Sequence, residues 1–228
     1  MSQDQRDPRP EAQGEPQAAE GVQDETERDA AHKQRMVELK AKHDAEVRAR
    51  RDKKGLLLVH TGDGKGKSTA GFGLALRAAG NGMKVAVVQF TKGKWKTGEA
   101  AAFKRFEEID HFIVGDGFTW ETQNRQADTR AAREGFALVE QLIERCRGEQ
   151  PAYQLIVLDE LNIVVDYDYL PVDLVVRTLS ARPEGLHVCC TGRGARPELI
   201  EIADTVTEMR MIKHAYASGI RAQRGIEF

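Results

Sequence analysis

Short apolar runs, separated by longer stretches of mixed apolar and polar residues, recur from residue 55 to the end of the chain. Each run is continuous rather than alternating, which is typical of strands buried on both faces of a sheet. The predicted strands are "LLLVHT" (56–61), "KVAVVQF" (84–90), "HFIV" (111–114), "LIVLDE" (155–160), "LHVCCT" (186–191) and "TVTEM" (205–209).

Helices are predicted between these runs. They are Ser68–Ala79 with Gly80 at a C-cap position, Glu99–Glu107, Asp128–Arg147, Pro171–Ala181 with proline in its first turn, and Pro197–Ala203. Strands interleaved with helices of this length predict an α/β domain over residues 55–228, with a mostly parallel sheet flanked by helices. Ligands of such sheets bind beyond the carboxyl ends of the strands, so the residues that follow each strand are the candidates for chemistry.

The amino-terminal part of the chain has a different composition. Residues 1–31 contain no Leu, Ile or aromatic side chain, so they cannot bury enough apolar surface to form a core and are expected to be disordered. Residues 32–54 predict a charged amphipathic helix with a narrow stripe at Met36, Leu39, His43 and Val47. This helix could dock on the domain or on a second subunit, or it could remain solvated.

Charge and cysteine content exclude several classes of protein. Lys and Arg number 34 and Asp and Glu 36, for a net charge of −2, so no overall field favours nucleic acid or a membrane as a partner. No apolar run approaches the roughly 20 residues that span a bilayer, and "MSQDQRDPRP" lacks the core of a secretory signal. Cys146, Cys189 and Cys190 form no C-x-x-C pair, and the last two are expected in the core. A reduced, cytoplasmic protein is the simplest interpretation.

The stretch "HTGDGKGKSTAGFG" (60–73) follows the first strand and resembles a phosphate-binding loop, or P-loop. The usual pattern G-x-x-x-x-G-K-[ST] fits Gly66, Lys67 and Ser68, but it requires glycine at position 61, where this chain has threonine. Closely spaced glycines let backbone N–H groups approach an anion, and the next helix adds the positive end of its dipole. The residues expected to bind a nucleotide here are Thr61, Gly62, Asp63, Gly64, Lys65, Gly66, Lys67, Ser68 and Thr69.

A second candidate site residue lies at the end of the strand "LIVLDE". An acidic residue at the end of a strand next to a P-loop is a common partner for Mg²⁺. Asp159 and Glu160 are the candidates, with Glu160 favoured as the direct ligand. The hydroxyl of Ser68 or Thr69 can also bind the cation, and Ser68 with Glu160 is the predicted ligand pair for Mg²⁺ (or Mn²⁺). These features alone allow a kinase, an ATPase or a GTPase, although the chain has no N-K-x-D guanine motif.

Four further segments narrow the choice. "VQFTKGKWKTGE" (88–99), "GFTWETQN" (117–124), "VLDEL…YDYLP" (157–171) and "TGRG" (191–194) follow the P-loop in that order, and the chain ends in "MIKHAYASGIRAQRGIEF". Together with the loop they closely resemble the P-loop family of corrinoid adenosyltransferases, of the cob(I)alamin or cob(I)yrinic acid a,c-diamide type. The resemblance extends from about Met36 to Phe228 and implies a P-loop, RecA-like fold. The family's loop also begins with Thr-Gly, so Thr61 is a family variant.

The resemblance implies a function. Family members transfer the 5′-deoxyadenosyl group of ATP to the Co(I) of a reduced corrinoid and release triphosphate, in cobalamin biosynthesis or salvage. The implied catalytic residues are Lys67, with Phe118 and Trp120 as the aromatic pair that displaces the lower cobalt ligand. Arg193 is expected to bind phosphate or ribose. The implied partners are a reduced flavoprotein as electron donor and a second copy of the chain in a homodimer.

Two other functions remain open from the sequence. A conventional phosphotransferase or ATPase would use the same loop and would produce ADP. A corrinoid carrier would retain the adenosylated product instead of turning over. The loop lysine and both acidic residues are intact, so a catalytically silent nucleotide-binding protein is disfavoured.

Overall fold

The computed structural model describes residues 17–91, 97–114 and 125–227, with the side chains of residues 17–24 and of residue 26 left out. It divides into two units, residues 1–52 and residues 53–228, which are described separately. The first unit contains helix α1 (Gln17–Ala49) and the second contains the sheet and the other helices.

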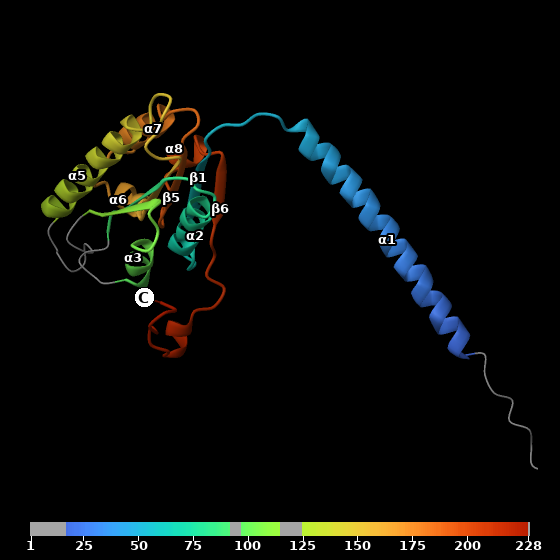
Figure 1. Ribbon diagram of the computed structural model, residues 1–228. Coiled ribbons are helices and arrows are strands. Elements are labelled where there is room, and N and C mark those ends of the chain that lie inside the picture. The colour runs from blue at the N-terminus through green and yellow to red at the C-terminus, as the bar shows by residue number, and fades with distance from the viewer. Residues whose placement is uncertain (1–16, 92–96, 115–124, 228) are drawn as a thin grey trace, which may run out of the picture. The chain divides into compact units, whose positions relative to one another are not determined.

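The sheet of the second unit has the strand order β3-β2-β4-β5-β1-β6, and every adjacent pair is parallel (Figure 1). The P-loop strand β1 is separated from the acidic strand β4 by β5 alone. The strands are β1 (Leu57–Thr61), β2 (Val85–Gln89), β3 (Ile109–Ile113), β4 (Leu155–Asp159), β5 (His187–Thr191) and β6 (Thr205–Glu208). The predicted α/β fold with a mostly parallel sheet is confirmed.

Helices cover both faces of this sheet. They are α2 (Lys67–Ala79), α3 (Gly98–Phe103), α5 (Arg125–Glu144), α6 (Leu161–Asp166), α7 (Val172–Ser180) and α8 (Pro197–Glu201). The 3-10 helix η1 (Ala215–Ser218) has no buried residue and lies in the carboxyl-terminal segment. Side chains along β1, β2, β4 and β5 alternate between two buried cores, whereas the edge strand β6 is exposed. In β4, Leu155 and Val157 pack with α2 and α3, whereas Ile156 and Leu158 pack with α5, α6, α7 and α8. Burial on both faces explains why the strands are continuously apolar in sequence.

Most predicted elements are present with shifted ends. The predicted helix Glu99–Glu107 ends at Phe103, and Pro171 is the N-cap of α7 rather than its first residue. Gly80 is the C-cap of α2 as predicted, but its backbone is right-handed, and the left-handed glycine of this turn is Gly82 (φ 74°). Helix α6 was not predicted, because its six residues "LNIVVD" are too few to show a helical period.

Helix α1 begins at Gln17, ahead of the predicted start of the charged helix at residue 32, so it includes part of the segment expected to be disordered. The absence of large apolar residues rules out a packed core for this segment, but it does not rule out a helix. Ala, Glu, Gln and Arg have high helix propensity, and side chains four residues apart can interact on the helix surface. Gln34 donates a hydrogen bond to Glu38, and Arg50 pairs with Glu46. Docking of this helix on the domain or on a second subunit remains a prediction.

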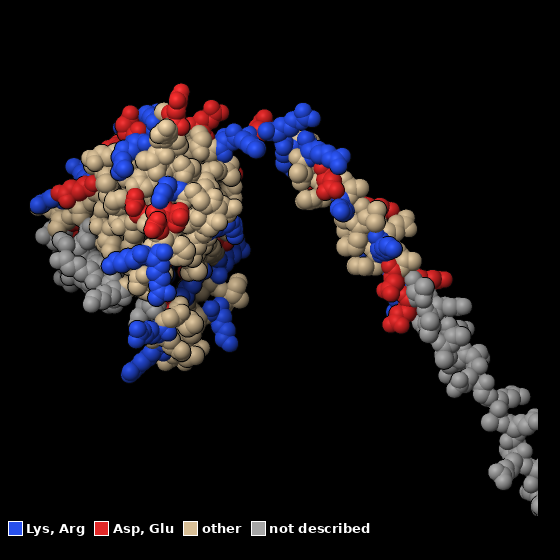
Figure 2. Space-filling model, in the orientation of Figure 1, with Lys and Arg blue, Asp and Glu red and all other residues tan. Residues whose placement is uncertain are grey.

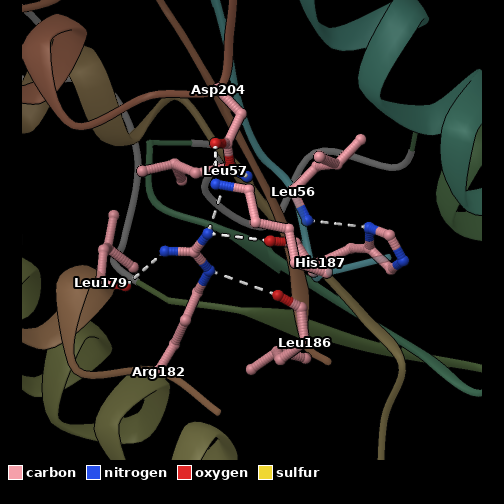
Figure 3. A network of polar contacts seen from close by, with 9 residues as sticks. Leu56, Leu57, Leu179, Arg182, Leu186, His187 and Asp204 are labelled. Atoms are coloured by element: carbon pink, nitrogen blue, oxygen red, sulfur yellow. Dashed lines mark hydrogen bonds and ion pairs between the residues drawn. The ribbon is translucent and has the colours of Figure 1, made fainter. Parts of the chain in front are cut away.

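A network of hydrogen bonds connects the segments that precede β1, β5 and β6 (Figure 3). The guanidinium of Arg182 donates hydrogen bonds to the carbonyl oxygens of Leu179 (2.8 Å), Leu186 (3.3 Å) and Gly55 (3.1 Å). It also approaches the carboxylate of Asp204, which accepts the N–H of Leu57 at 2.9 Å. Arg182 therefore joins the segments that enter β1, β5 and β6, and so sets the position from which β1 runs into the P-loop.

Replacement of Arg182 by alanine should lower the free energy of unfolding by roughly 2–3 kcal/mol, because the side chain is only 12% exposed and several charge-assisted bonds are lost. Urea denaturation followed by circular dichroism measures this change. Arg147 is the matched control: it also contacts a carbonyl and a carboxylate, but it is 48% exposed, so Arg147→Ala should cost less than about 1 kcal/mol. Equal losses in the two variants would contradict the proposed role of Arg182.

Candidate functional site

The strand order brings the predicted site segments together at the carboxyl edge of the sheet. His60 of β1 pairs with Thr191 of β5, and Cys190 of β5 pairs with Leu158 of β4, so the segments that follow these strands are neighbours. Between them lies a cavity of about 440 Å³. It is lined by Gly64, Lys65, Gly66, Lys67, Ser68, Thr69, Glu99, Glu160, Ile163, Asp166, Tyr167, Arg193, Ile226 and Glu227.

The P-loop lies against the segment that follows β6. The N–H of Gly64 donates to the carbonyl oxygen of Met209 at 2.7 Å, and the N–H of Met209 donates to the carbonyl oxygen of Thr61 at 2.8 Å. Gly62 has φ 92°, and a Cβ at this position would overlap Met209. A Cβ on Gly64 would lie 2.7 Å from the same carbonyl oxygen. The glycines are required because the chain behind the loop leaves no room for side chains.

Thr61 occupies the position where the usual motif has glycine. Its hydroxyl accepts a hydrogen bond from the N–H of Ala195 at 3.1 Å, and Ala195 belongs to the loop that follows β5. Glycine could not make this contact. The threonine thus ties the start of the P-loop to the "TGRG" segment that carries Arg193.

Lys67 is the buried cation of the site. It is the first residue of α2, after Gly66 (φ 106°), its side chain is 8% exposed, and its ammonium donates to the carbonyl oxygen of Gly64. Burial lowers the pKa of Lys67, and the positive charge of Arg193 lowers it further, while the carboxylates of Glu160 and Asp63 act in the opposite direction. A bound polyanion would offset the cost of holding two cations so close together.

The two acidic residues after β4 differ in their surroundings. Asp159 has no exposed surface, and its two carboxylate oxygens accept hydrogen bonds from the Thr191 hydroxyl and from the Gln89 amide, both at 2.8 Å. Glu160 is partly exposed and lines the cavity. Of the two candidates, Glu160 is therefore the one placed to contact a ligand, and Asp159 is a buried structural carboxylate.

The cavity brings together most of the predicted binding residues. Gly64 to Thr69, Glu160 and Arg193 line it, whereas Thr61, Gly62 and Asp63 lie at the start of the loop and outside this lining. The predicted aromatic pair, Phe118 and Trp120, lies outside the described residues.

Several lining residues were not singled out from the sequence. Glu99, Asp166 and Tyr167 fall inside the motifs quoted above, which was a signal that could have identified them. Ile226 and Glu227 come from the far end of the chain, and the carboxylate of Glu227 forms an ion pair with Lys65 that lowers the pKa of Glu227. Figure 2 shows mainly basic side chains around this carboxyl-terminal segment, whose charged residues after Met209 are Arg210, Lys213, Arg221, Arg224 and Glu227.

The cavity offers some of the oxygen ligands that a hard cation needs, but not a complete set. No group of three or more His, Cys, Asp or Glu side chains that could hold a metal is found among the described residues. The Ser68 hydroxyl and the Glu160 carboxylate nevertheless line the same cavity. Mg²⁺ is commonly held by one or two protein oxygens together with phosphate oxygens and water, so this pair fits Mg²⁺ bound with a nucleotide.

The remaining candidates for chemistry belong to the core. His60 is 8% exposed, burial lowers its pKa, and its Nδ1 lies 3.9 Å from the sulfur of Cys189. Burial raises the pKa of Cys189 to about 12 and that of Cys190 well above its usual value. Both cysteines have no exposed surface, so they lie in the core as predicted. Within the described part of the chain, no helix is both long and apolar enough to span a membrane.

Comparisons with known proteins assign the chain to a family. Residues 53–228 match the family model described as ATP:corrinoid adenosyltransferase BtuR/CobO/CobP. The chain is 50% identical over 203 residues to the corrinoid adenosyltransferase of Pseudomonas aeruginosa, covering 89% of this chain and 98% of that protein. It is 42% identical over 200 residues to the corrinoid adenosyltransferase of Escherichia coli and to corrinoid adenosyltransferase CobA of Salmonella typhimurium, covering 88% of this chain and 99% of each.

Gly62→Ala should weaken ATP binding by at least about tenfold, because the new methyl group requires a strained backbone and overlaps Met209. Titration calorimetry with ATP measures the loss. Gly73→Ala, in the same segment, is the control: a Cβ there meets nothing within 4 Å, so affinity should be unchanged and the helix stabilised by up to about 1 kcal/mol. Normal ATP affinity in Gly62→Ala would contradict the described packing of the loop.

Proposed function

Because this chain belongs to the ATP:corrinoid adenosyltransferase family, we propose that the cavity above its P-loop holds the triphosphate of ATP during adenosyl transfer. The chain transfers the adenosyl group of ATP to the cobalt of a reduced corrinoid, in cobalamin biosynthesis or salvage. The observation that carries the proposal is the convergence of the loop backbone, Lys67 and Arg193 on one cavity at the carboxyl edge of the sheet.

The reaction is a displacement at the ribose C5′ of ATP. The two electrons of Co(I) form the cobalt–carbon bond while the bond between C5′ and oxygen breaks, and the triphosphate leaves with that bonding pair. Co(I) is itself a strong nucleophile, so no activated Ser, Cys or Lys is required. The protein must align the cobalt with C5′ and stabilise the charge that develops on the leaving group.

Three groups of this chain meet the second requirement. The first-turn N–H groups of α2 direct the positive end of the helix dipole at the phosphates, and Lys67 supplies a buried positive charge. Arg193 adds a guanidinium that can donate two hydrogen bonds to one phosphate. Lys67 and Arg193 are close enough for the charge of Arg193 to lower the pKa of Lys67, which favours a highly charged ligand between them.

Ser68 and Glu160 would hold Mg²⁺, or Mn²⁺, as the remaining ligands of a nucleotide-bound cation. When bound, Mg²⁺ neutralises charge on the phosphate oxygens and so assists departure of the triphosphate. The hydroxyl of Ser68 comes from the first turn of α2, and the carboxylate of Glu160 comes from the residue that follows β4; both residues line the cavity. Ser68 follows Lys67 directly in the chain, so a cation held by Ser68 and Glu160 would act together with the Lys67 charge on the triphosphate.

The proposals for how the corrinoid is bound and reduced come from the family resemblance. Phe118 and Trp120 are proposed to displace the lower ligand of cob(II)alamin, which makes the cobalt four-coordinate and easier to reduce. A reduced flavoprotein is the proposed electron donor, and a cytoplasmic homodimer is the proposed form of the enzyme.

Lys67→Ala should abolish adenosyl transfer, with a loss of at least about a hundredfold, because the buried positive charge that faces the leaving group is removed. The assay is anaerobic: ATP, Mg²⁺ and chemically reduced cobalamin are mixed with enzyme, and loss of the Co(I) spectrum is followed together with triphosphate release. Lys104→Ala removes an exposed lysine and should leave the rate unchanged. Near-normal turnover by Lys67→Ala, or ADP in place of triphosphate, would refute the proposed role of the loop.

Trp120→Ala should impair the reaction that starts from cob(II)alamin and a reduced flavoprotein far more than the reaction that starts from pre-reduced Co(I). The reason is that displacement of the lower ligand is needed only when Co(II) must still be reduced on the enzyme. Parallel assays from the two oxidation states give the ratio directly. Similar losses in both assays would mean that Trp120 serves another purpose.

A further inference from the structure

The hydroxyl of Thr191 bridges the two acidic residues that follow β4. Thr191 is the last residue of β5 and has no exposed surface. Its Oγ1 donates a hydrogen bond to Oδ1 of Asp159 at 2.8 Å and accepts the backbone N–H of Glu160 at 3.1 Å. The buried hydroxyl of Thr191 therefore contacts both the carboxylate of Asp159 and the backbone of Glu160.

Glu160 needs such a contact because of its backbone conformation. Its φ of 63° and ψ of 18° lie in the left-handed region, which is unfavourable for a residue with a Cβ. A residue holds this conformation only when its surroundings fix it. The conformation ends β4, begins α6 and places the Glu160 side chain at the cavity. The N–H that Thr191 accepts belongs to the peptide group whose orientation sets this φ.

Asp159 fixes the hydroxyl of Thr191 in turn. A carboxylate only accepts hydrogen bonds, so the single proton of the Thr191 hydroxyl is directed to Asp159, and an oxygen lone pair remains for Glu160. The other carboxylate oxygen of Asp159 accepts a hydrogen bond from the side-chain amide of Gln89 at 2.8 Å. The side-chain oxygen Oε1 of Gln89 lies 2.7 Å from Nε2 of His111. This line of contacts crosses β3, β2, β4 and β5, so it is anchored in the rigid sheet.

We propose that Thr191 is a positioning residue: its hydroxyl holds the left-handed backbone of Glu160 so that the Glu160 carboxylate can coordinate the nucleotide-bound cation. The inference rests on the proposed function of Glu160 as a metal ligand and adds a residue that touches neither metal nor nucleotide. Groups that orient a metal ligand from behind typically contribute 10–100-fold to metal affinity, so the loss of this hydroxyl should be measurable.

The test measures how much the metal strengthens ATP binding. Titration calorimetry gives the Kd of ATP with Mn²⁺ present and with EDTA present, in the absence of corrinoid so that no reaction occurs. Thr191→Val keeps the side-chain shape and removes the hydroxyl, whereas Thr191→Ser keeps the hydroxyl. The metal effect is the Kd of ATP in EDTA divided by its Kd in Mn²⁺. This ratio should fall by roughly tenfold in Thr191→Val and stay within about twofold of the native ratio in Thr191→Ser. The Kd in EDTA should be nearly unchanged in both.

Glu160→Gln separates this inference from the function on which it rests. If Glu160→Gln loses the metal effect while Thr191→Val keeps it, the positioning role is refuted and the metal assignment stands. If Glu160→Gln keeps the native ratio, the metal assignment itself fails, and the positioning role fails with it.

Two controls exclude a general packing defect. A purely structural role would weaken ATP binding in EDTA as much as in Mn²⁺, and that result would refute the proposal. Equal loss of the metal effect in Thr191→Ser would also refute it, because the hydroxyl would then not be the cause. If Thr191→Val does not fold, Thr191→Ala, which leaves more space in the core, is measured in its place with the same expected ratio.

Discussion

Close packing of the P-loop against the segment after β6 is the constraint on which the site depends. The backbone of Met209 exchanges hydrogen bonds with the loop and leaves no space for side chains at Gly62 and Gly64. The loop is therefore supported from behind by the backbone of Met209, and Gly66 and Lys67 line the cavity. An anion site of this kind needs rigid N–H groups, because donors that must reorganise at each turnover stabilise developing charge less well. Strand β6 thus contributes to the site although it supplies no lining residue.

The second structural feature of the site is that the adjacent acidic residues Asp159 and Glu160 lie in different surroundings. Along β4 the side chains alternate between the two faces, and the change to a left-handed backbone at Glu160 breaks this alternation at the sheet edge. Asp159 remains in the sheet, where its carboxylate accepts hydrogen bonds from Gln89 and Thr191, and Glu160 lines the cavity. Thr191 links the two residues, because its hydroxyl contacts both the carboxylate of Asp159 and the backbone N–H of Glu160.

Residues near the end of the chain, far from the P-loop in sequence, complete the lining of the cavity. Ile226 and Glu227 line it, and Glu227 pairs with Lys65 of the P-loop. A carboxylate beside the phosphate site reduces the excess of positive charge there when no nucleotide is bound. The carboxyl-terminal segment carries Arg210, Lys213, Arg221 and Arg224, so its overall charge is favourable to anionic ligands.

The sequence by itself determined the fold class, the P-loop and the family. Continuous apolar runs of strand length are typical of strands covered on both faces. The glycine spacing with Lys67 and Ser68 is recognisable as a P-loop without any knowledge of tertiary contacts. It also indicated Glu160, as an acidic residue after a buried strand. Helix α6 and the start of α1 at Gln17 were missed, because six residues are too few to show a period and a solvated helix needs no apolar side chains. Tertiary structure alone decided which of Asp159 and Glu160 faces the cavity, why Thr61 replaces glycine, and that Glu227 reaches Lys65. Each of these depends on hydrogen bonds or ion pairs between segments far apart in the chain, and local sequence does not encode such distances.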